Sequence, residues 1–464
     1  MNIQDYIKRR NNLKEKVKEG IIFLSGNSLV PRNYPSNPFS FRQDSTFLYY
    51  TGIDLPDFYL IIDCDKSEEI LFGNELTTED TVWSGAKESI KEIANKTGIK
   101  CTKSVSELSN TIINAKSKNR KIHFLPPYPG SRQILLSKLM GLDIEKLIEN
   151  TSRELIEAVI SQRSVKSDKE VLQIENALND VTGPMHIKAM QMAQPGIYEY
   201  EIVAEMNRMA KLKNIDFAYP VICSVYGEIL HNDTHGNKLQ KGQLLLIDAG
   251  AENQLHYASD ITRTTPVGGK FDSRQKAIYE IVLNTQEQAI ESVKPGVKYL
   301  DIHIEAAKNI TSGLKDLGLI KGNIEEAVQA GAHALFFPHG LGHMLGLDVH
   351  DMEDLGENLV GYDKNIKRSS QFGTAYLRLA RTLEPGFVIT VEPGIYFIPQ
   401  LISLWRTGKK FNDFINYPES EKFLDFGGIR IEDNVLVING GHKVLGNKIP
   451  KSVTDIENIS FTIQ

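Results

Sequence analysis

The sequence predicts an α/β domain at the amino terminus and a larger α+β domain after it. Strand-like and helix-like stretches alternate up to about residue 160, and the part that follows repeats a helix–Pro-Gly–helix unit. The chain of 464 residues is longer than one ordinary domain, and 41% hydrophobic with 24% charged residues is a globular composition. We therefore expect two domains, 1–162 and 163–464.

The first domain is predicted from short apolar runs of strand length. The runs are Ile21–Leu24, Phe58–Cys64 and Ile122–Leu125, and helix-like segments cover 84–95 and 134–140. The polar first twenty residues predict an amphipathic helix and not a signal peptide with an apolar centre.

Composition and charge argue against a nucleic-acid-binding protein and against a membrane protein. A net charge of -6 with no basic block predicts no nucleic-acid surface, and no apolar run reaches the ~20 residues of a membrane helix. The three cysteines, Cys64, Cys101 and Cys223, form no CxxC pair, which is typical of a reducing compartment. We expect a cytoplasmic protein that binds neither nucleic acid nor a membrane.

The second domain is expected to begin with a long helix. A capping box at Ser167–Glu170 predicts its start, and it should run to about Ala193. Pro195-Gly196 and Pro295-Gly296 each stand between two predicted helices, and the helices that follow them are at 199–213 and 300–317. The two helix–Pro-Gly–helix units suggest a duplicated half-domain.

Two aspartates face each other across a predicted hairpin. An apolar strand runs into Asp248 and a second strand contains Asp260, so a turn centred at Gln254 would place them directly opposite. Carboxylates that close would repel unless a cation lies between them. The alternative is a pair of surface aspartates beside a turn, and the hairpin alone leaves both open.

Three of the eleven histidines, His339, His343 and His350, lie within twelve residues. The glycines between them disfavour a helix, so His339 and His343 do not form a helical metal pair. A single histidine is more often structural, whereas three beside a glycine-containing loop indicate a site.

Two glutamates emerge from β-branched runs, Glu392 after Phe387–Val391 and Glu432 within Gly427–Asp433. A glutamate in a buried strand is costly unless it is paired or bound to a metal. An ordinary salt bridge with an arginine is the alternative. Taken with the two aspartates and a histidine, these acids would neutralise two divalent cations, and such oxygen-rich ligation suits manganese, with cobalt, iron or zinc as alternatives.

The same segments resemble a known family. IDAG…DITRT, HGLGHMLGLDVHD, VEPGIY and GGIRIED stand in the order found in metallopeptidases of the pita-bread fold, in the branch of Xaa-Pro aminopeptidase (aminopeptidase P) and prolidase. Phe41–Gly52 resembles the signature of that branch's amino-terminal domain. The resemblance covers nearly the whole chain and implies an aminopeptidase P-type domain before a pita-bread domain with pseudo-twofold duplication.

The resemblance also implies the metal ligands, which are Asp248, Asp260, His343, Glu392 and Glu432. Asp260 and Glu432 would bridge two ions, Asp248 would bind one of them, and His343 with Glu392 the other. By the same match His231 is expected to contact the substrate. His339 and His350 correspond to the two histidines that flank the ligand histidine, and Arg430 is expected to support the carboxylates.

The implied activity is hydrolysis of the bond between a peptide's first residue and a following proline, by a hydroxide that bridges the metals. Glu392 is expected to carry a proton to the leaving prolyl nitrogen. His339 and His350 are expected to donate hydrogen bonds to the developing oxyanion or the proline carbonyl. The alternatives are a prolidase restricted to Xaa-Pro dipeptides and a non-catalytic peptide-binding protein of this fold.

Other expectations concern assembly and the rim of the cleft. Proteins of this branch are commonly homo-oligomers, so a homodimer or homotetramer is expected. Two segments, 358–379 and 401–423, lengthen the chain relative to the family pattern. They are expected to reshape the cleft rim and to leave the ligands unchanged.

Overall fold

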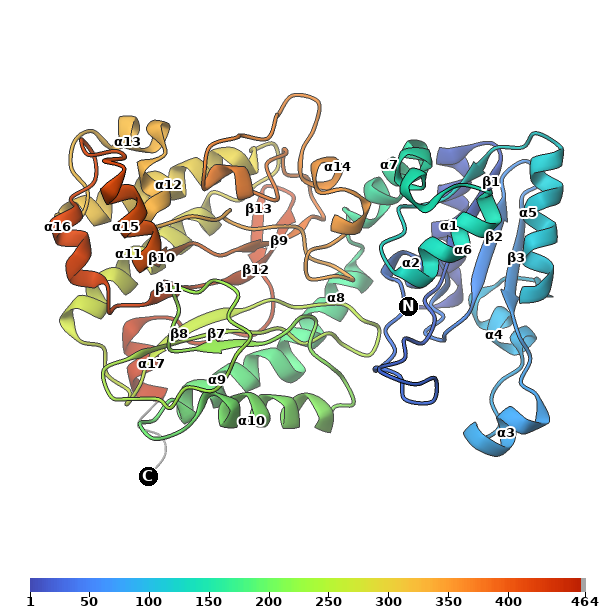
Figure 1. The fold of residues 1–464 in the computed structure, drawn as a ribbon, viewed down its shortest axis with the longest axis horizontal. Helices are drawn as coiled ribbons and strands as arrows, with labels where there is room; N and C mark the ends of the chain where they lie inside the picture. The colour runs from blue at the N-terminus through green and yellow to red at the C-terminus, as the bar shows by residue number, and fades with distance from the viewer. Residues whose placement is uncertain (460–464) are drawn as a thin grey trace. The chain divides into compact units, whose positions relative to one another are not determined.

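The computed structural model describes residues 1–459, and the chain divides into two compact units (Figure 1). The first unit is 1–163 with the short segment 354–356, and the second is 164–353 with residues from 357 onward. Across 1–459, every helix is too short or too polar to traverse a lipid bilayer.

The first unit is built on a five-stranded sheet with the strand order β4-β3-β2-β1-β5. Its central strands pair antiparallel, and β4 and β5 add in parallel at the edges. The strands are β1 (Ile21–Ser25), β2 (Tyr59–Asp63), β3 (Glu68–Gly73), β4 (Cys101–Ser104) and β5 (Ile122–His123). The helices are α1 (Ile3–Val17), α2 (Ser45–Thr51), α3 (Thr78–Ser84), α4 (Ile90–Thr97), α5 (Leu108–Ser117), α6 (Gly130–Met140) and α7 (Arg153–Arg163).

Apolar burial explains this sheet. Strands β1 and β2 are buried along their whole length, as expected of strands covered on both faces. Phe23 of β1 shares a core cluster with Ile112 of α5. The predicted strands are present, but the helix expected at 84–95 starts only at Ile90, because the hydroxyl of Ser89 caps the first turn of α4.

The second unit repeats one arrangement of helices and strands. Helices α8 (Asp168–Ala177) and α9 (Gly183–Met192) precede α10 (Glu199–Leu212) and the sheet β6-β7-β8. Helix α11 (Ser273–Glu291) precedes α12 (Tyr299–Asp316) and the sheet β13-β12-β9. The long helix predicted at the start of this unit is therefore present as α8 and α9, which a π-helical turn joins.

The strands of this unit are short and buried where they approach the candidate site. They are β6 (Ile222–Ser224), β7 (Leu244–Asp248), β8 (Thr262–Pro266), β9 (Val388–Val391), β10 (Gly394–Tyr396), β11 (Gly428–Arg430), β12 (Asp433–Ile438) and β13 (Gly441–Val444), with β10 and β11 as a separate pair. The remaining helices are α13 (Ile324–Ala330), α14 (Glu357–Gly361), α15 (Pro399–Thr407), α16 (Tyr417–Ser420) and α17 (Val453–Ile459).

Backbone hydrogen bonds confirm the predicted duplication. The amide of Gly196 donates to the carbonyl of Leu239, and that of Gly296 donates to Leu383, each at 2.9 Å. Both leucines return a bond of 2.8 Å to the residue after the glycine. The two Pro-Gly turns thus make the same contacts in both halves.

Equivalent positions of the two halves carry two of the candidate ligands. Gly242 and Gly386 precede β7 and β9 and have φ angles of 89° and 91°, which glycine adopts readily. Six residues after each glycine stands an acid, Asp248 in the first half and Glu392 in the second. The duplication therefore places one carboxylate at the same end of two related strands.

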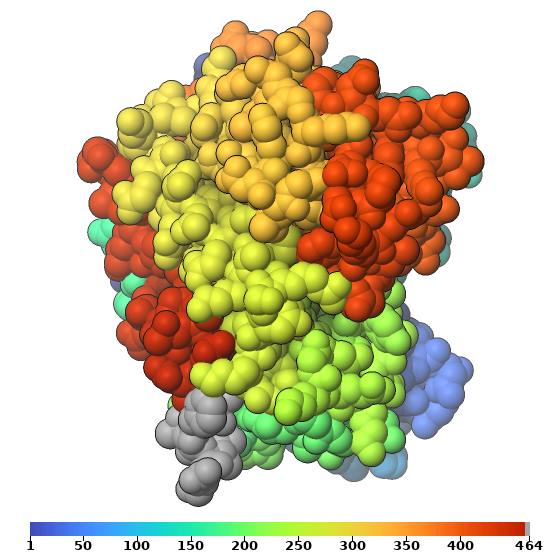
Figure 2. Space-filling model, turned by 90° about the vertical axis from the view of Figure 1, so that its left-hand side faces the viewer, coloured from blue at the N-terminus to red at the C-terminus, as the bar shows by residue number. Residues whose placement is uncertain are grey.

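The two insertions meet in the second unit. Phe372 of the first and Trp405 of the second have ring centroids 5.8 Å apart. Lys410 Nζ lies 4.0 Å from the Trp405 ring centroid. In Figure 2 the orange-red surface of the second insertion stands above a notch, whose opposite wall is green like the segment between α10 and β7.

Candidate active site

The five predicted ligands come from strand ends and one loop of the second unit. Asp248 ends β7, Asp260 precedes β8, Glu392 follows β9, and Glu432 lies between β11 and β12. His343 belongs to the loop between α13 and α14. Four of the five are at most 9% exposed, and only the Glu392 side chain reaches 18% exposure. Backbone hydrogen bonds hold neighbouring strands side by side, so carboxylates at the ends of these strands lie close together.

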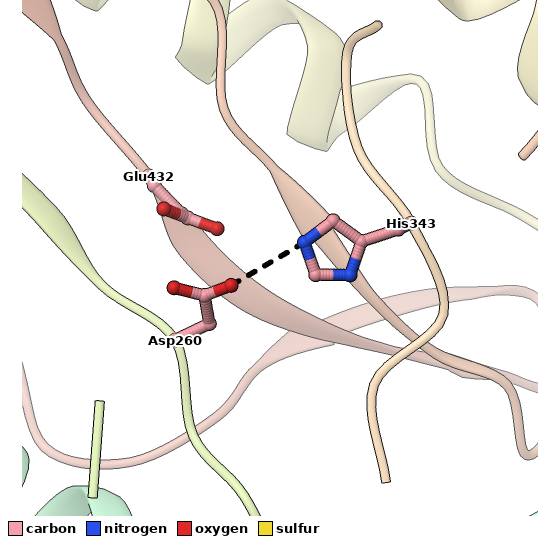
Figure 3. Close-up of side chains that lie close together, drawn as sticks. All are labelled: Asp260, His343 and Glu432. Carbon is pink, nitrogen blue, oxygen red and sulfur yellow. Dashed lines mark ion pairs between the residues drawn. The ribbon is translucent and has the colours of Figure 1, made fainter. Parts of the chain in front are cut away.

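Asp260, His343 and Glu432 form the centre of the site (Figure 3). One ligating atom of each lies within 4.8 Å of the others. His343 Nε2 is 3.3 Å from Asp260 Oδ2 and 3.5 Å from Glu392 Oε1. Asp248 joins them through the Tyr219 hydroxyl, which lies 2.7 Å from Asp248 Oδ1 and also hydrogen bonds to Asp260.

The hairpin register differs from the prediction. Asp248 pairs with Thr262 and not with Asp260. The flanking backbone bonds place Asp260 opposite Gly250, where a Cβ would lie 1.7 Å from the carbonyl oxygen of Ser259. The turn is centred one residue further along the chain than expected, and glycine at position 250 lets the two strands approach without a clash. Both aspartates still face the Tyr219 hydroxyl.

The histidine loop runs along β9 like an added strand. Thr390 N donates to His343 O at 3.0 Å, and Leu345 N donates to Val388 O at 2.9 Å. Gly342 lies against this strand, and a Cβ there would be 2.2 Å from Thr390 O. The glycines of this motif permit the close backbone approach that brings His343 to the acids.

The electrostatics of the cluster fit divalent cations. His343 Nδ1 donates to Met344 O at 3.0 Å, so Nε2 faces the acids. Burial opposes protonation of His343, but its hydrogen bond to Asp260 and the charge of Glu392 raise its pKa to about 9. Burial and nearby carboxylates raise the pKa of Glu432, whose Oε1 has no hydrogen-bond partner in the described chain. Surplus buried negative charge with an open acceptor is what a cation would satisfy.

Arg430 contacts the carboxylate cluster directly. Its Nη2 pairs with Asp248 Oδ2, and its Nε donates to Thr262 Oγ1 at 3.2 Å. Its Nη1 donates to the Tyr396 hydroxyl at 2.8 Å. The guanidinium is 4% exposed, so these three contacts hold a buried positive charge against the acids.

His339 and His350 both carry their proton on Nδ1. His339 Nδ1 lies 2.8 Å from Gly340 O, which can only accept, and its Nε2 lies 2.9 Å from the Tyr396 hydroxyl. Burial lowers the pKa of His339 to about 3, so the ring is neutral and Nε2 accepts. His350 Nδ1 faces Glu353 Oε2 at 3.3 Å. With the proton on Nδ1, Nε2 of each ring is an acceptor; the expectation that both histidines donate to the substrate, which requires a proton on Nε2, remains a prediction.

His231 and Tyr219 complete the site. His231 lies on the exposed loop after β6, and partial burial and the Arg430 charge lower its pKa. The charge of Asp248 acts in the opposite direction and raises the pKa of this imidazole, so His231 is within electrostatic range of the cluster. Tyr219 was not predicted, because it stands outside the recognised motifs. Tyr396 lies within VEPGIY, one of the segments that carry the family resemblance, so its place in this segment was a signal from which it could have been predicted.

The fold and the site together define a metallopeptidase: a duplicated helix-and-strand unit that holds buried acids and a histidine at the ends of its strands. The model of metallopeptidase family M24 matches residues 176–439, and that of the aminopeptidase P N-terminal domain matches 6–123. The chain belongs to metallopeptidase family M24. The predicted pita-bread fold and family are thereby confirmed.

Related proteins and solved structures match this chain along nearly its whole length. A probable Xaa-Pro aminopeptidase of Fusarium vanettenii is 35% identical over 96% of this chain and 94% of its own. One of Metarhizium acridum is 34% identical over 98% and 88%. The Pseudomonas aeruginosa aminopeptidase PepP and a zinc-substituted Escherichia coli aminopeptidase P with product each superpose with a TM-score of 0.81 at 28% identity, covering 99% of this chain and 98% of theirs.

Proposed function

We propose that this protein is a metal-dependent Xaa-Pro aminopeptidase, which removes the residue preceding a proline from a peptide's amino terminus. The observation that carries the proposal is the meeting of Asp260, His343 and Glu432 within 4.8 Å, with Asp248 and Glu392 beside them. The names of relatives that match 96% and 98% of the chain support the choice of substrate.

The donor set fits two divalent ions. The residues that would hold the ions are Asp248, Asp260, His343, Glu392 and Glu432. Oxygen-rich ligation with one imidazole favours manganese, with cobalt, iron or zinc as alternatives. When bound, the ions polarise the scissile carbonyl and lower the pKa of a water molecule, which supplies the nucleophile at neutral pH.

The chain's own residues position the substrate and move the proton. Glu392 Oε1 lies 3.4 Å from Thr390 Oγ1, a contact that orients this carboxylate to take a proton and pass it to the leaving prolyl nitrogen. His350 Nε2 offers an acceptor held in place by Glu353, and His231 offers a second imidazole from the loop after β6. A prolyl nitrogen has no N–H, so a site without an acceptor at that point accepts a bond that most peptidases reject.

Substrate and metal assays test the proposal. The purified protein should cleave Ala-Pro-Ala and leave Ala-Ala-Ala intact. A chelator should abolish the activity, and added Mn²⁺ should restore it. Metal analysis should find two ions per chain, and Asp260→Ala should lose them. Hydrolysis of Ala-Pro alone, without Ala-Pro-Ala, would instead identify a prolidase, and no hydrolysis by the metal-loaded protein would refute the proposal.

The role of Glu392 has its own test. Glu392→Gln keeps the shape of the side chain and removes its capacity to carry a proton, so kcat should fall by about 10²–10⁴-fold. The metal content must be measured on the same sample, because Glu392 is also a proposed ligand. A variant that keeps both metals and near-normal kcat would show that the proton takes another path.

The domain division and assembly belong to the same proposal. We assign an aminopeptidase P-type domain to 1–162 and the metallopeptidase domain to 163–464, and the division into compact units after residue 163 supports this. A homodimer or homotetramer and a cytoplasmic location remain predictions. Light scattering of the purified protein and fractionation of the host cell test them.

A further inference from the structure

Glu199 is a fully buried carboxylate outside the segments that carry the family resemblance. It is the first residue of α10 and is 0% exposed. Its Oε1 accepts from the amide of Val225 at 2.8 Å, and its Oε2 accepts from the amide and from the Nδ2 of Asn237 at 3.0 and 2.9 Å. A buried carboxylate is costly unless it is hydrogen bonded, and N–H bonds to an ionised acceptor are stronger than neutral ones. Glu199 therefore fastens two separate points of the chain.

These two points are the ends of the His231 loop, which we define as residues 225–237 and which follows β6. Asn232, the neighbour of His231 in the chain, donates from Nδ2 to Ser224 Oγ at 2.9 Å. Ser224 is the last residue of β6, so the middle of the loop is tied to the same place as its first residue. The position of His231 thus depends on how the ends of the loop are held.

The His231 loop lies against residues of the candidate site. Leu230 packs against an apolar cluster that contains Tyr396. The Tyr396 hydroxyl accepts from Arg430 Nη1 at 2.8 Å. A Cβ on Gly227 would lie 2.7 Å from Gly428 O, so the loop also touches β11, the strand that ends at Arg430. Two contacts therefore place the chain around His231 beside Tyr396 and Arg430.

The duplication of the unit puts a similar fastener in the second half. Tyr299 is the first residue of α12, as Glu199 is of α10, and each is the third residue after the glycine of a Pro-Gly turn. Tyr299 is also 0% exposed, and its hydroxyl lies 2.7 Å from Thr390 O and 3.2 Å from Leu341 O. It thus ties the loop that carries His343 to β9. Equivalent helix starts therefore hold one loop of the candidate site in each half.

We propose that Glu199 is a positioning residue, which holds the His231 loop so that His231 faces the substrate. This inference rests on the proposed Xaa-Pro aminopeptidase function. Glu199 takes no part in the chemistry, because its carboxylate is buried against the loop. Without the clamp, His231 leaves its place beside Tyr396, so the substrate loses a contact while the metal ligands keep theirs.

A double-mutant cycle tests whether Glu199 acts through His231. Glu199→Gln keeps the shape of the side chain but turns one acceptor oxygen into a donor, which faces an N–H group and releases one end of the loop. It should lower kcat/KM for Ala-Pro-Ala by about 10–10²-fold, and by no more than His231→Ala does. The double variant should stay within about twofold of His231→Ala, because two residues that act as a unit do not add.

Hydrogen exchange measures the clamp without any activity. The amides of residues 225–237 should exchange about tenfold faster or more in Glu199→Gln than in the wild type, because an anchored loop opens less often. The matched control is Glu201→Gln, an exposed acid of the same helix that accepts from Tyr198 N at 2.7 Å. It should change neither the exchange of the loop nor kcat/KM. The metal content of all variants should equal that of the wild type.

Losses that multiply in the double variant, or a loss of metal in Glu199→Gln, would overturn the inference, since Glu199 would then support the fold or the metal site and not His231. Unchanged exchange in Glu199→Gln would refute the clamp itself. If Glu199→Gln does not fold, Asn237→Ala removes one of the three bonds from a half-buried residue and should give a smaller loss that is equally absent from the double variant with His231→Ala. Failure of the wild type to cleave Ala-Pro-Ala would refute the proposed function instead.

Discussion

The buried pair of Lys166 and Asp351 offers a test of how the histidine loop is held. Lys166 Nζ lies 3.0 Å from Asp351 Oδ2, and both side chains are 1% exposed. Asp351 follows His350, and its carboxylate also packs against Gly346, where a Cβ would lie 2.4 Å away. The pair therefore fixes the end of the loop that carries His343 and His350.

The perturbation is Lys166→Met, which keeps the aliphatic stem and removes the charge. Breaking a buried pair by removing one partner costs about 3–5 kcal/mol, because the Asp351 carboxylate stays buried and loses its ionic contact with Lys166. An unfolding entropy of about 2.1 cal/mol/K per residue gives roughly 0.6 kcal/mol/K for a unit of about 300 residues. The Tm of this unit should therefore fall by about 5–8 °C.

Differential scanning calorimetry of the metal-free protein measures this shift without a contribution from bound ions. The double variant Lys166→Met/Asp351→Asn should recover a large part of the loss, because it also removes the buried negative charge. Lys443→Met is the matched control, since its pair with Glu175 is 52% and 22% exposed and should be worth at most about 1 kcal/mol. A loss in Lys166→Met no larger than in this control would refute the reasoning.

Two further predictions concern buried groups around the site. Burial lowers the pKa of His186 to about 4, below its unfolded value of about 6.5, so the unfolded chain binds the proton first and stability falls as the pH drops from 6.5 to 4. Chemical denaturation should show that the free energy of unfolding falls by about 3 kcal/mol less between pH 6.5 and pH 4 in His186→Gln than in the wild type. An equal fall in both proteins would contradict the assignment. Gly250→Ala places a Cβ 1.7 Å from Ser259 O, so it should lower Tm strongly and abolish metal binding. Gly130→Ala, which meets nothing within 4 Å, should leave both unchanged, and a fully stable Gly250→Ala would show that the hairpin can shift.

Local pattern predicted most of the elements but not their exact limits. The buried runs that became β1, β2 and β7 are continuous in sequence, so burial alone identified them. Residues 84–95 read as one helix, but the cap at Ser89 moved its start to Ile90. The centre of the hairpin at Asp248 was placed one residue out, because the length of a turn depends on left-handed residues such as His256, whose φ is 63°. Such conformations carry little signal in side-chain pattern.

Sequence alone indicated the order of the candidate ligands and the Pro-Gly repeat, because these depend on residue type and spacing, and the family resemblance implied the ligand set. The structure added that the repeat places Asp248 and Glu392 at equivalent strand ends. Tertiary structure decided which atoms meet. Tyr219 and Asp260 are 41 residues apart, and Thr262 and Glu432 are 170 apart, yet each pair shares a hydrogen bond. It also decided that the His339 proton lies on Nδ1, since the carbonyl of Gly340 can only accept. Hydrogen-bond partners and proton positions depend on distances between packed segments, and those distances exist only after the chain has folded.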